Sequence, residues 1–299
     1  MQADSAPNKI LDALAANRDN ALLPANRAAV ERMRSIPLPV HEYYICFTPR
    51  SGRTWLNEIL TQAQLMGVPG EWFNPGQLAK NIVKRYPCAD LPEYMDCIKR
   101  KTSATSGVFG AEISFFQYEI LERALAACDA RELVDRGRSK LIYLWRQDLL
   151  AQAVSLYRAT ETGMFHSVQR NAAVREETDF AYSESKIWKW MIHLLQQELG
   201  WVRWLNKREL PYLNLSYEEL WSSTELTLAR LFQYVLGDAN EPRPRVADLT
   251  LSHRKIANAR SESLVQEFYA GNAAKVEFCL ENRGKLDATA LKRELKLAI

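Results

Sequence analysis

The chain of 299 residues is 47% hydrophobic and 25% charged, the composition of an ordinary folded protein, which excludes a largely disordered chain. Its net charge of +3 is too small to indicate nucleic-acid binding, so any preference for an anion must come from local clusters of basic residues. The five cysteines are odd in number and form no C-x-x-C pair. This argues against a disulfide framework or a zinc site and favours reduced thiols in a cytoplasmic protein.

No apolar run reaches about 18 residues, so we expect no transmembrane segment, and the N-terminus lacks the basic and apolar regions of a signal peptide. The four histidines are scattered without the spacing of metal ligands. No H-E-x-x-H, G-x-S-x-G or G-x-G-x-x-G motif is present, and we expect no bound metal.

Two short helices are expected at the start of the chain. Apolar residues such as Ile10 and Leu14 recur at helical spacing. Pro24 suits the first turn of a second helix, and Pro37 ends that helix. We interpret residues 1–40 as an N-terminal helical extension.

The stretch Tyr43–Leu60 is predicted to be a strand, a short basic loop and a helix. Its apolar, aromatic-rich first half ends at Pro49, as expected of a buried strand. From Thr54 onward the apolar residues recur at helical spacing, and Gly52 between the two can adopt backbone angles that other residues avoid. The N-terminus of the helix offers unpaired N–H groups and a partial positive charge to an anion.

The side chains of this loop add to the anion site. Arg50 and Arg53 bring positive charge, and Ser51 and Thr54 bring hydroxyl groups. The loop differs from the nucleoside-triphosphate motif G-x-x-x-x-G-K-S/T, because it has one glycine and the basic residue precedes it. We predict a phosphate or sulfate cradle here; the alternative is an ordinary strand-to-helix turn with surface arginines.

The segment Gly67–Pro75 contains two glycines and two prolines and is expected to be a loop at the carboxyl edge of the sheet. It places Glu71 beside Trp72 and Phe73. Glu71 is either a solvated loop acid next to two packing residues, or a general base that the aromatics partly desolvate while they form an acceptor pocket.

Strands and helices then alternate. Two helices are expected within residues 76–103, followed by a strand at Gly107–Ile113 and a helix that ends near Cys128. A second clear strand at Lys140–Arg146 leads into a helix with apolar residues from Leu149 onward.

Arg146 ends that strand, and Ser155 lies about two turns into the next helix. A planar guanidinium and a hydroxyl in this arrangement can converge on one phosphate. The alternative is an Arg146 paired with Asp148 and a Ser155 on an ordinary helix face.

The last third of the chain is rich in helices. The segment at residues 252–263 carries three basic residues, and a helix is expected to begin within it, near Ser261. A basic loop at a helix start predicts either a further anion cradle or an ordinary helix cap. In chain order we expect a helix end at Gly163, a long loop at about 166–178, a helix at 182–207 and a strand at 210–216. Helices from Tyr217 and at about 225–235, turns at 237–244 and a helical tail from 272 follow.

This alternation indicates an α/β fold. We expect a single domain at 41–270 with a central, mostly parallel sheet flanked by helices, and a C-terminal helical tail at 271–299.

Three segments in order carry a resemblance to a known family: PRSGRTW at 49–55, WRQDLLAQAVSLYRA at 145–159, and RKIANARSES at 254–263. Their order is similar to that in sulfotransferases that use 3′-phosphoadenosine 5′-phosphosulfate (PAPS). The chain most resembles the bacterial family typified by trehalose 2-O-sulfotransferase, whose signature R-x-D-x-x-x-Q-A-V-S-x-x-R-A is present from Arg146 to Ala159. The resemblance covers roughly Tyr43–Tyr269 and implies the P-loop-like sulfotransferase fold.

The resemblance also implies roles for single residues. Glu71 matches the acid proposed as the catalytic base, Arg50 would stabilise the leaving phosphate, and Tyr217 would lie near the adenine. The 5′-phosphosulfate would be held by Arg50, Ser51, Gly52, Arg53 and Thr54, with Trp55 next to them, and the 3′-phosphate by Arg146, Ser155, Arg260 and Ser261.

Three departures from the family pattern bear on these roles. Arg53 replaces a usual Ser or Thr, Glu112 stands where a basic residue is frequent, and the match of Glu71 depends on a gap. The last two affect the acceptor more than the donor.

The resemblance implies sulfuryl transfer from PAPS to a hydroxyl of a carbohydrate or glycolipid acceptor, without metal and with PAP as product. The alternatives are a nucleotide-dependent small-molecule kinase, which the missing G-K-S/T disfavours, and a non-catalytic protein that binds PAP or sugar on the same fold. The sequence names no acceptor and leaves a homodimer open.

Overall fold

The computed structural model describes residues 8–130, 133–134, 138–165, 181–237, 245–252 and 259–297. Its centre is a four-stranded sheet in the order β2-β1-β3-β4, and every neighbouring pair of strands is parallel. This confirms the predicted α/β fold with a parallel sheet. The strands are β1 (His41–Phe47), β2 (Val108–Ser114), β3 (Ser139–Trp145) and β4 (Tyr212–Ser216).

Helices cover both faces of the sheet, and the strands are correspondingly apolar on both faces, as parallel strands usually are. Along β1, Tyr44 and Cys46 belong to one buried cluster, whereas Tyr43, Ile45 and Phe47 belong to another. The two sets alternate because successive side chains of a strand point to opposite faces.

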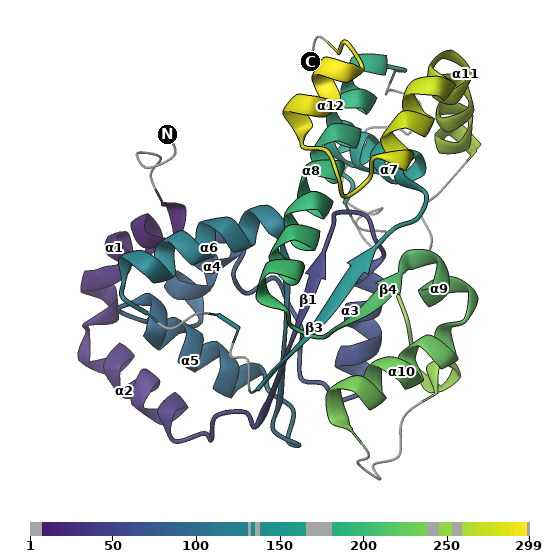
Figure 1. The fold of residues 1–299 in the computed structure, drawn as a ribbon. Coiled ribbons are helices and arrows are strands. Elements are labelled where there is room, and N and C mark those ends of the chain that lie inside the picture. The colour runs from purple at the N-terminus through teal and green to yellow at the C-terminus, as the bar shows by residue number, and fades with distance from the viewer. Residues whose placement is uncertain are drawn as a thin grey trace.

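Five helices pack around the face that carries Tyr44. Both N-terminal helices take part, since Ile10, Leu14, Val30 and Met33 are buried in the same cluster as the strand residues. They form the group on the left of Figure 1. The helices are α1 (Lys9–Ala21), α2 (Pro24–Arg34), α4 (Pro75–Lys84), α5 (Leu91–Thr102) and α6 (Phe115–Ala127).

The opposite face is covered by helices that follow β1 and β4. Leu56 and Leu60 of the first, and Leu228 and Phe232 of the last, are buried against Ile45 and its neighbours. These helices are α3 (Arg53–Gln62), α9 (Tyr217–Ser222) and α10 (Thr224–Leu236).

A third cluster joins four helices beyond the sheet, in the upper part of Figure 1. The 25-residue helix α8 is about 38 Å long and connects this group to the sheet: Met191 is buried in the helical cluster, while Trp201 and Leu205 are buried in the cluster around Tyr44. The helices are α7 (Leu149–Thr162), α8 (Glu184–Arg208), α11 (Ala259–Glu281) and α12 (Ala288–Glu294).

Most predicted strands and helices agree with the observed ones within about two residues, but the tail expected from 272 consists of the second half of α11 and of α12. The strand expected from Leu210 begins at Tyr212, and the helix expected near Ser261 begins at Ala259. Three predictions lie outside the described residues: the loop at 166–178, the turns at 238–244 and the basic residues at 253–258. Among the described residues, no helix is long and apolar enough to cross a membrane.

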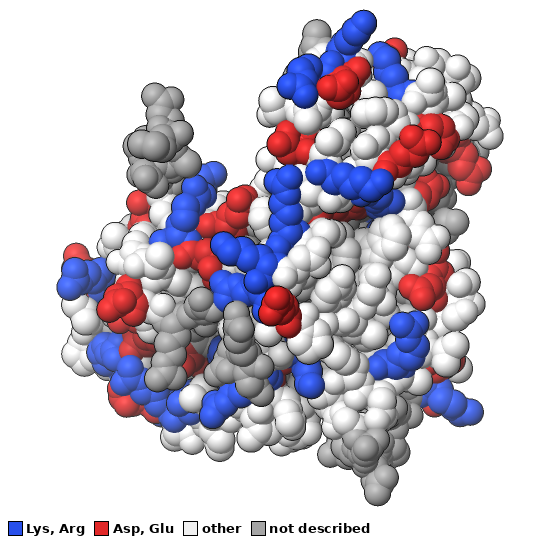
Figure 2. Space-filling model, in the orientation of Figure 1, with Lys and Arg blue, Asp and Glu red and all other residues white. Residues whose placement is uncertain are grey.

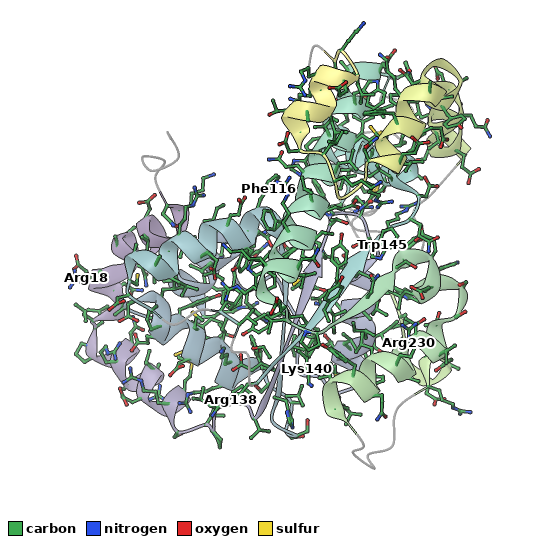
Figure 3. All side chains as sticks on the ribbon, in the orientation of Figure 1. Arg18, Phe116, Arg138, Lys140, Trp145 and Arg230 are labelled. Atoms are coloured by element: carbon green, nitrogen blue, oxygen red, sulfur yellow. The ribbon has the colours of Figure 1, made fainter. Side chains whose placement is uncertain are left out.

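The strand order creates a crevice at the carboxyl edge of the sheet. β1 lies between β2 and β3. The chain after β1 therefore leads to β2 on one side of β1, and the chain after β2 leads to β3 on the other side. Ligands of open α/β sheets bind where the strand order reverses in this way. In Figure 3, Trp145 marks the carboxyl end of β3, close to the upper helices, whereas Lys140 lies toward the opposite end.

Candidate active site

A cavity of about 710 Å³ opens at this carboxyl edge, within the size range of small-ligand sites. Its walls come from the segments that follow all four strands and from the first turns of α11. The lining residues include Arg50, Gly52, Arg53, Thr54 and Trp55 after β1, Glu71 and Asn74, Ser114 and Gln117 after β2, Arg146, Asp148, Ser155 and Arg158 after β3, Tyr217 and Trp221 after β4, and Ser261.

The loop after β1 has the conformation expected of an anion-binding turn. Gly52 is the N-cap of α3 and has φ = 82°, in the left-handed region. A Cβ atom at Gly52 would lie 2.6 Å from Cδ2 of Tyr217. The glycine is therefore required both for its backbone angles and for the close approach of the Tyr217 ring.

Arg50 links this loop to α7. Its Nε donates a 3.0 Å hydrogen bond to Oγ of Ser155, and its Nη1 donates one of 2.6 Å to the carbonyl of Phe165. Burial, followed by repulsion from Arg158, Arg53 and Arg146, lowers the pKa of Arg50 to about 10. Positive charge is concentrated here, and an anionic ligand would relieve the repulsion.

Arg146 follows β3 and stacks on Tyr217, with its Cζ 4.8 Å from the ring centroid. Its nearest described carboxylate is Glu218, whose Oε1 is 3.8 Å from Nε. That Nε is buried and has no hydrogen-bond partner among the described residues. A guanidinium held in this way can bind the oxygens of a phosphate.

Two further residues of α7 connect the parts of the site through hydrogen bonds. Gln152 is buried and donates from Nε2 to Oγ1 of Thr48 at 2.9 Å and to the carbonyl of Pro49 at 2.7 Å. Arg158 is only 2% exposed and donates from Nη1 to Oγ of Ser261 at 2.9 Å. The loop after β1, helix α7 and the start of α11 are thereby tied together.

The structure gives Ser51 and Arg260 different surroundings from those predicted. The hydroxyl of Ser51 is buried and donates a 2.7 Å hydrogen bond to the carbonyl of Thr48. The hydroxyl therefore stabilises the turn, and of Ser51 only the backbone N–H is still predicted to bind the 5′-phosphosulfate. Arg260 is exposed and does not line the cavity. Arg260 and Ser261 both lie in the first turn of α11, and Ser261 is the one on the side of the helix that faces the cavity.

Trp72 and Phe73 are packing residues. Phe73 is fully buried in the cluster around Tyr44, and Nε1 of Trp72 donates to the carbonyl of Val68 at 3.1 Å. Neither residue lines the cavity. Of the two alternatives for these aromatics, the structure favours the packing role over the acceptor pocket, because both rings anchor the loop.

Glu71 itself does line the cavity, and three side chains donate to it. Asn74 Nδ2 and Gln117 Nε2 lie 2.8 Å and 2.6 Å from its Oε2, and Arg53 forms an ion pair with its Oε1. Arg53 also donates to Oε2 of the buried Glu112 at 2.8 Å. Its guanidinium is thus engaged by two carboxylates.

The sequence contains signals for some residues that were not predicted. Gln117 is the last residue of the pattern S-x-x-Q that begins at Ser114, and its Oε1 accepts from the Ser114 N–H at 3.0 Å, as in a capping box. Trp221 lies one helical turn after Tyr217, is 46% exposed, and its ring centroid is 5.2 Å from that of Trp55. No local signal marks Trp221 as a partner of Trp55.

Comparison with known proteins decides the family. Residues 42–271 match the family model described as Stf0 sulphotransferase. The chain belongs to the Stf0 sulphotransferase family.

Two relatives of this sulfotransferase are similar over most of their length. A trehalose 2-sulfotransferase of Mycobacterium tuberculosis is 23% identical over 268 residues, which cover 77% of this chain and 95% of the relative. A trehalose 2-sulfotransferase of Mycolicibacterium smegmatis is 24% identical over 263 residues, which cover 76% and 93%. The resemblance inferred from the sequence motifs is therefore confirmed.

One residue that supports the site, Arg283, lies outside residues 42–271, which match the family model. Arg283, after α11, forms an ion pair with Glu198 of α8 at 2.6 Å and donates to the backbone carbonyls of Arg146 and Gln147. The C-terminal segment therefore supports the backbone that carries Arg146.

The cavity gathers several arginines, whereas the surface of this sulfotransferase mixes both signs of charge. On the face shown in Figure 2, basic and acidic side chains are interspersed, in keeping with a net charge of +3. Within the described residues, no group of His, Cys, Asp and Glu has the arrangement of a metal site.

Proposed function

We propose that this sulfotransferase transfers the sulfuryl group of PAPS to a hydroxyl of a carbohydrate or glycolipid acceptor. The observation that carries the proposal is the convergence of Arg50, Arg146 and Arg158 from separate elements on one cavity at the carboxyl edge of the sheet. Ser155, which accepts from Arg50, lies among them. Such a cluster suits a ligand with two separate phosphate groups better than a single anion.

The residues present fit this donor. The buried Arg146 Nε without a hydrogen-bond partner and the hydroxyl of Ser155 would bind the 3′-phosphate. The N–H groups at the start of α3 and the guanidinium of Arg50 would bind the 5′-phosphosulfate. Tyr217, between Gly52 and Arg146, would lie beside the adenine.

In the proposed reaction Glu71 accepts the proton of the acceptor hydroxyl while its oxygen forms a bond to sulfur. The bond between sulfur and the bridging phosphate oxygen breaks, and the electron pair stays on the phosphate. Arg50 and the α3 N–H groups stabilise the charge that develops there. General-base assistance of this kind contributes about 10²–10⁴-fold in rate.

A carbohydrate acceptor is supported by the polar wall around Glu71. Glu71, Asn74 and Gln117 all line the cavity, and planar amide and carboxylate groups are suited to pairs of hydroxyls. The two curated relatives are trehalose 2-sulfotransferases, which makes trehalose the first sugar to assay.

The first experiment is thermal unfolding of the protein with PAP, with ADP, and with ATP plus magnesium. Ligand at 100 times its dissociation constant stabilises the folded state by about 2.7 kcal/mol. We expect a larger shift with PAP than with ADP, followed by transfer of label from PAPS in an acceptor screen. A shift with magnesium-ATP alone would indicate the kinase, and no shift with any of the three would contradict the proposal.

Glu71→Gln tests the base. We expect loss of about 10²–10⁴-fold in kcat with an unchanged Kd for PAP, measured by calorimetry. Strong PAP binding in a wild-type protein that transfers no sulfuryl group to any acceptor would favour the non-catalytic alternative.

A further inference from the structure

Arg53 occupies the position at which the family resemblance predicts a ligand of the donor, but its guanidinium is directed elsewhere. Nη1 donates to Oε2 of Glu112 at 2.8 Å, and Nη2 pairs with Oε1 of Glu71. The guanidinium also lies 4.5 Å from the ring centroid of Phe47. Arg53 is therefore engaged by the two carboxylates, while Arg50 contacts Ser155 of α7.

From this geometry we propose that Arg53 and Glu112 are positioning residues for Glu71, and that Arg53 is not a donor ligand. This inference rests on the proposed function, in which Glu71 is the general base. The buried carboxylate of Glu112 anchors one edge of the guanidinium, and the other edge holds the carboxylate of Glu71 at the cavity.

The backbone of β2 holds the same loop a second time. The N–H of Glu112 donates to the carbonyl of Gly70 at 2.9 Å, and Gly70 pairs with Ala111 as an isolated parallel bridge. Glu71 follows directly. Glu112 thus fixes the position of Glu71 both through the backbone and through Arg53.

The groups that face Glu112 come from every element packed against it. Arg53 and Asn57 face it from α3, Glu71 from the loop and Tyr43 from β1. Its side chain is 1% exposed. If Arg53 turned away to bind the donor, this buried carboxylate would lose its cation and would have to take up a proton.

The two acids are coupled through their charges. Burial raises the pKa of Glu112 to about 7, Arg53 lowers it, and the negative charge of Glu71 raises it. The interaction between the two charges is mutual. We therefore expect ionisation of Glu112 to appear in the rate as a step of its own.

The test is the pH dependence of kcat with saturating PAPS and a saturating sugar acceptor, trehalose first. We expect the wild-type rate to rise in two steps from acid to neutral pH, and Glu112→Gln to show a single step. Arg53→Gln should move the acid limb to higher pH by about one unit or more, because it removes the cation that contacts Glu71. This shift is expected even when Glu112 takes up a proton, since Arg53 contacts Glu71 directly.

Donor affinity is the second readout. We expect Kd for PAP, measured by calorimetry, to change by less than about threefold in both variants, because neither side chain binds the donor in this assignment. Arg53→Lys, which keeps the charge, should recover part of the wild-type profile. Glu42→Gln is the matched control: Glu42 is a buried carboxylate paired with Lys99 at 2.8 Å, and we expect it to leave the profile unchanged.

Two results would overturn the inference. A tenfold weaker PAP affinity in Arg53→Gln with an unmoved acid limb would make Arg53 a donor ligand. A wild-type profile in Glu112→Gln would reduce Glu112 to a structural residue, and this variant decides the question even if Arg53→Gln does not fold. Failure of the proposed function looks different, since the wild-type protein itself would then transfer no sulfuryl group.

Discussion

The guanidinium of Arg283 donates a 2.8 Å hydrogen bond from Nη1 to the backbone carbonyl of Gln147. It also contacts the carbonyl of Arg146, pairs with the buried Glu198 and lies 4.7 Å from the ring centroid of Trp145. One side chain from the C-terminal segment therefore holds the end of β3, from which Arg146 reaches into the cavity.

Arg283→Met should weaken PAP binding by about fivefold or more, because the backbone under Arg146 loses its donors. It should also lower the free energy of unfolding by about 3–5 kcal/mol, since Glu198 is left buried and unpaired. The double variant Arg283→Met/Glu198→Gln separates the two effects. We expect it to recover much of the Tm but not the PAP affinity, and recovery of both would deny Arg283 a role at the donor site.

Arg146→Ala should abolish the preference for PAP over ADP. A hydrogen bond to a charged group contributes about 1.5–3 kcal/mol, so we expect PAP to bind roughly 10- to 150-fold more weakly. ADP lacks the 3′-phosphate and should bind nearly as before. Calorimetric titration of both ligands measures this, and an equal loss for PAP and ADP would place Arg146 elsewhere on the nucleotide.

Gly52→Ala should destabilise the protein for two reasons. The residue has φ = 82°, which costs an L-residue about 1–2 kcal/mol, and its Cβ would clash with the Tyr217 ring, which typically adds about 1–3 kcal/mol. Gly163→Ala is the matched control, with φ = 72° and no atom within 4 Å of the added Cβ. Denaturant unfolding should show a larger loss at Gly52, with weaker PAP binding there alone.

The carboxyl group of Glu112 makes stability depend on pH. Its pKa rises from an ordinary 4.5 to about 7 on folding, so the folded state binds the proton more tightly than the unfolded chain does. The resulting stabilisation is complete below about pH 4.5 and is lost as pH rises to about 7, a change of the order of 3 kcal/mol. Glu112→Gln should lack this decline, and unfolding curves of the two proteins between pH 4.5 and 8 compare them.

Much of the site could be predicted from local patterns. The loop at 50–54 and Arg146 follow apolar runs that become β1 and β3, and the carboxyl ends of parallel strands meet at one edge. Ser155 and Arg158 lie three residues apart on α7, so both face the same side of the helix. By contrast, the sequence could not show that the hydroxyl of Ser51 is used within its own turn.

The sequence by itself determined the strands, the glycine turn, the helix starts and the family, because hydrophobic period and backbone preference act over a few residues. The tertiary structure alone decided the partners of the long charged side chains. Arg53 pairs with Glu71 and Glu112, and Arg283 supports the backbone of Arg146. A guanidinium on a flexible stem can turn in several directions, and its direction is set by the carboxylates and carbonyls that distant segments bring within reach when the sheet assembles.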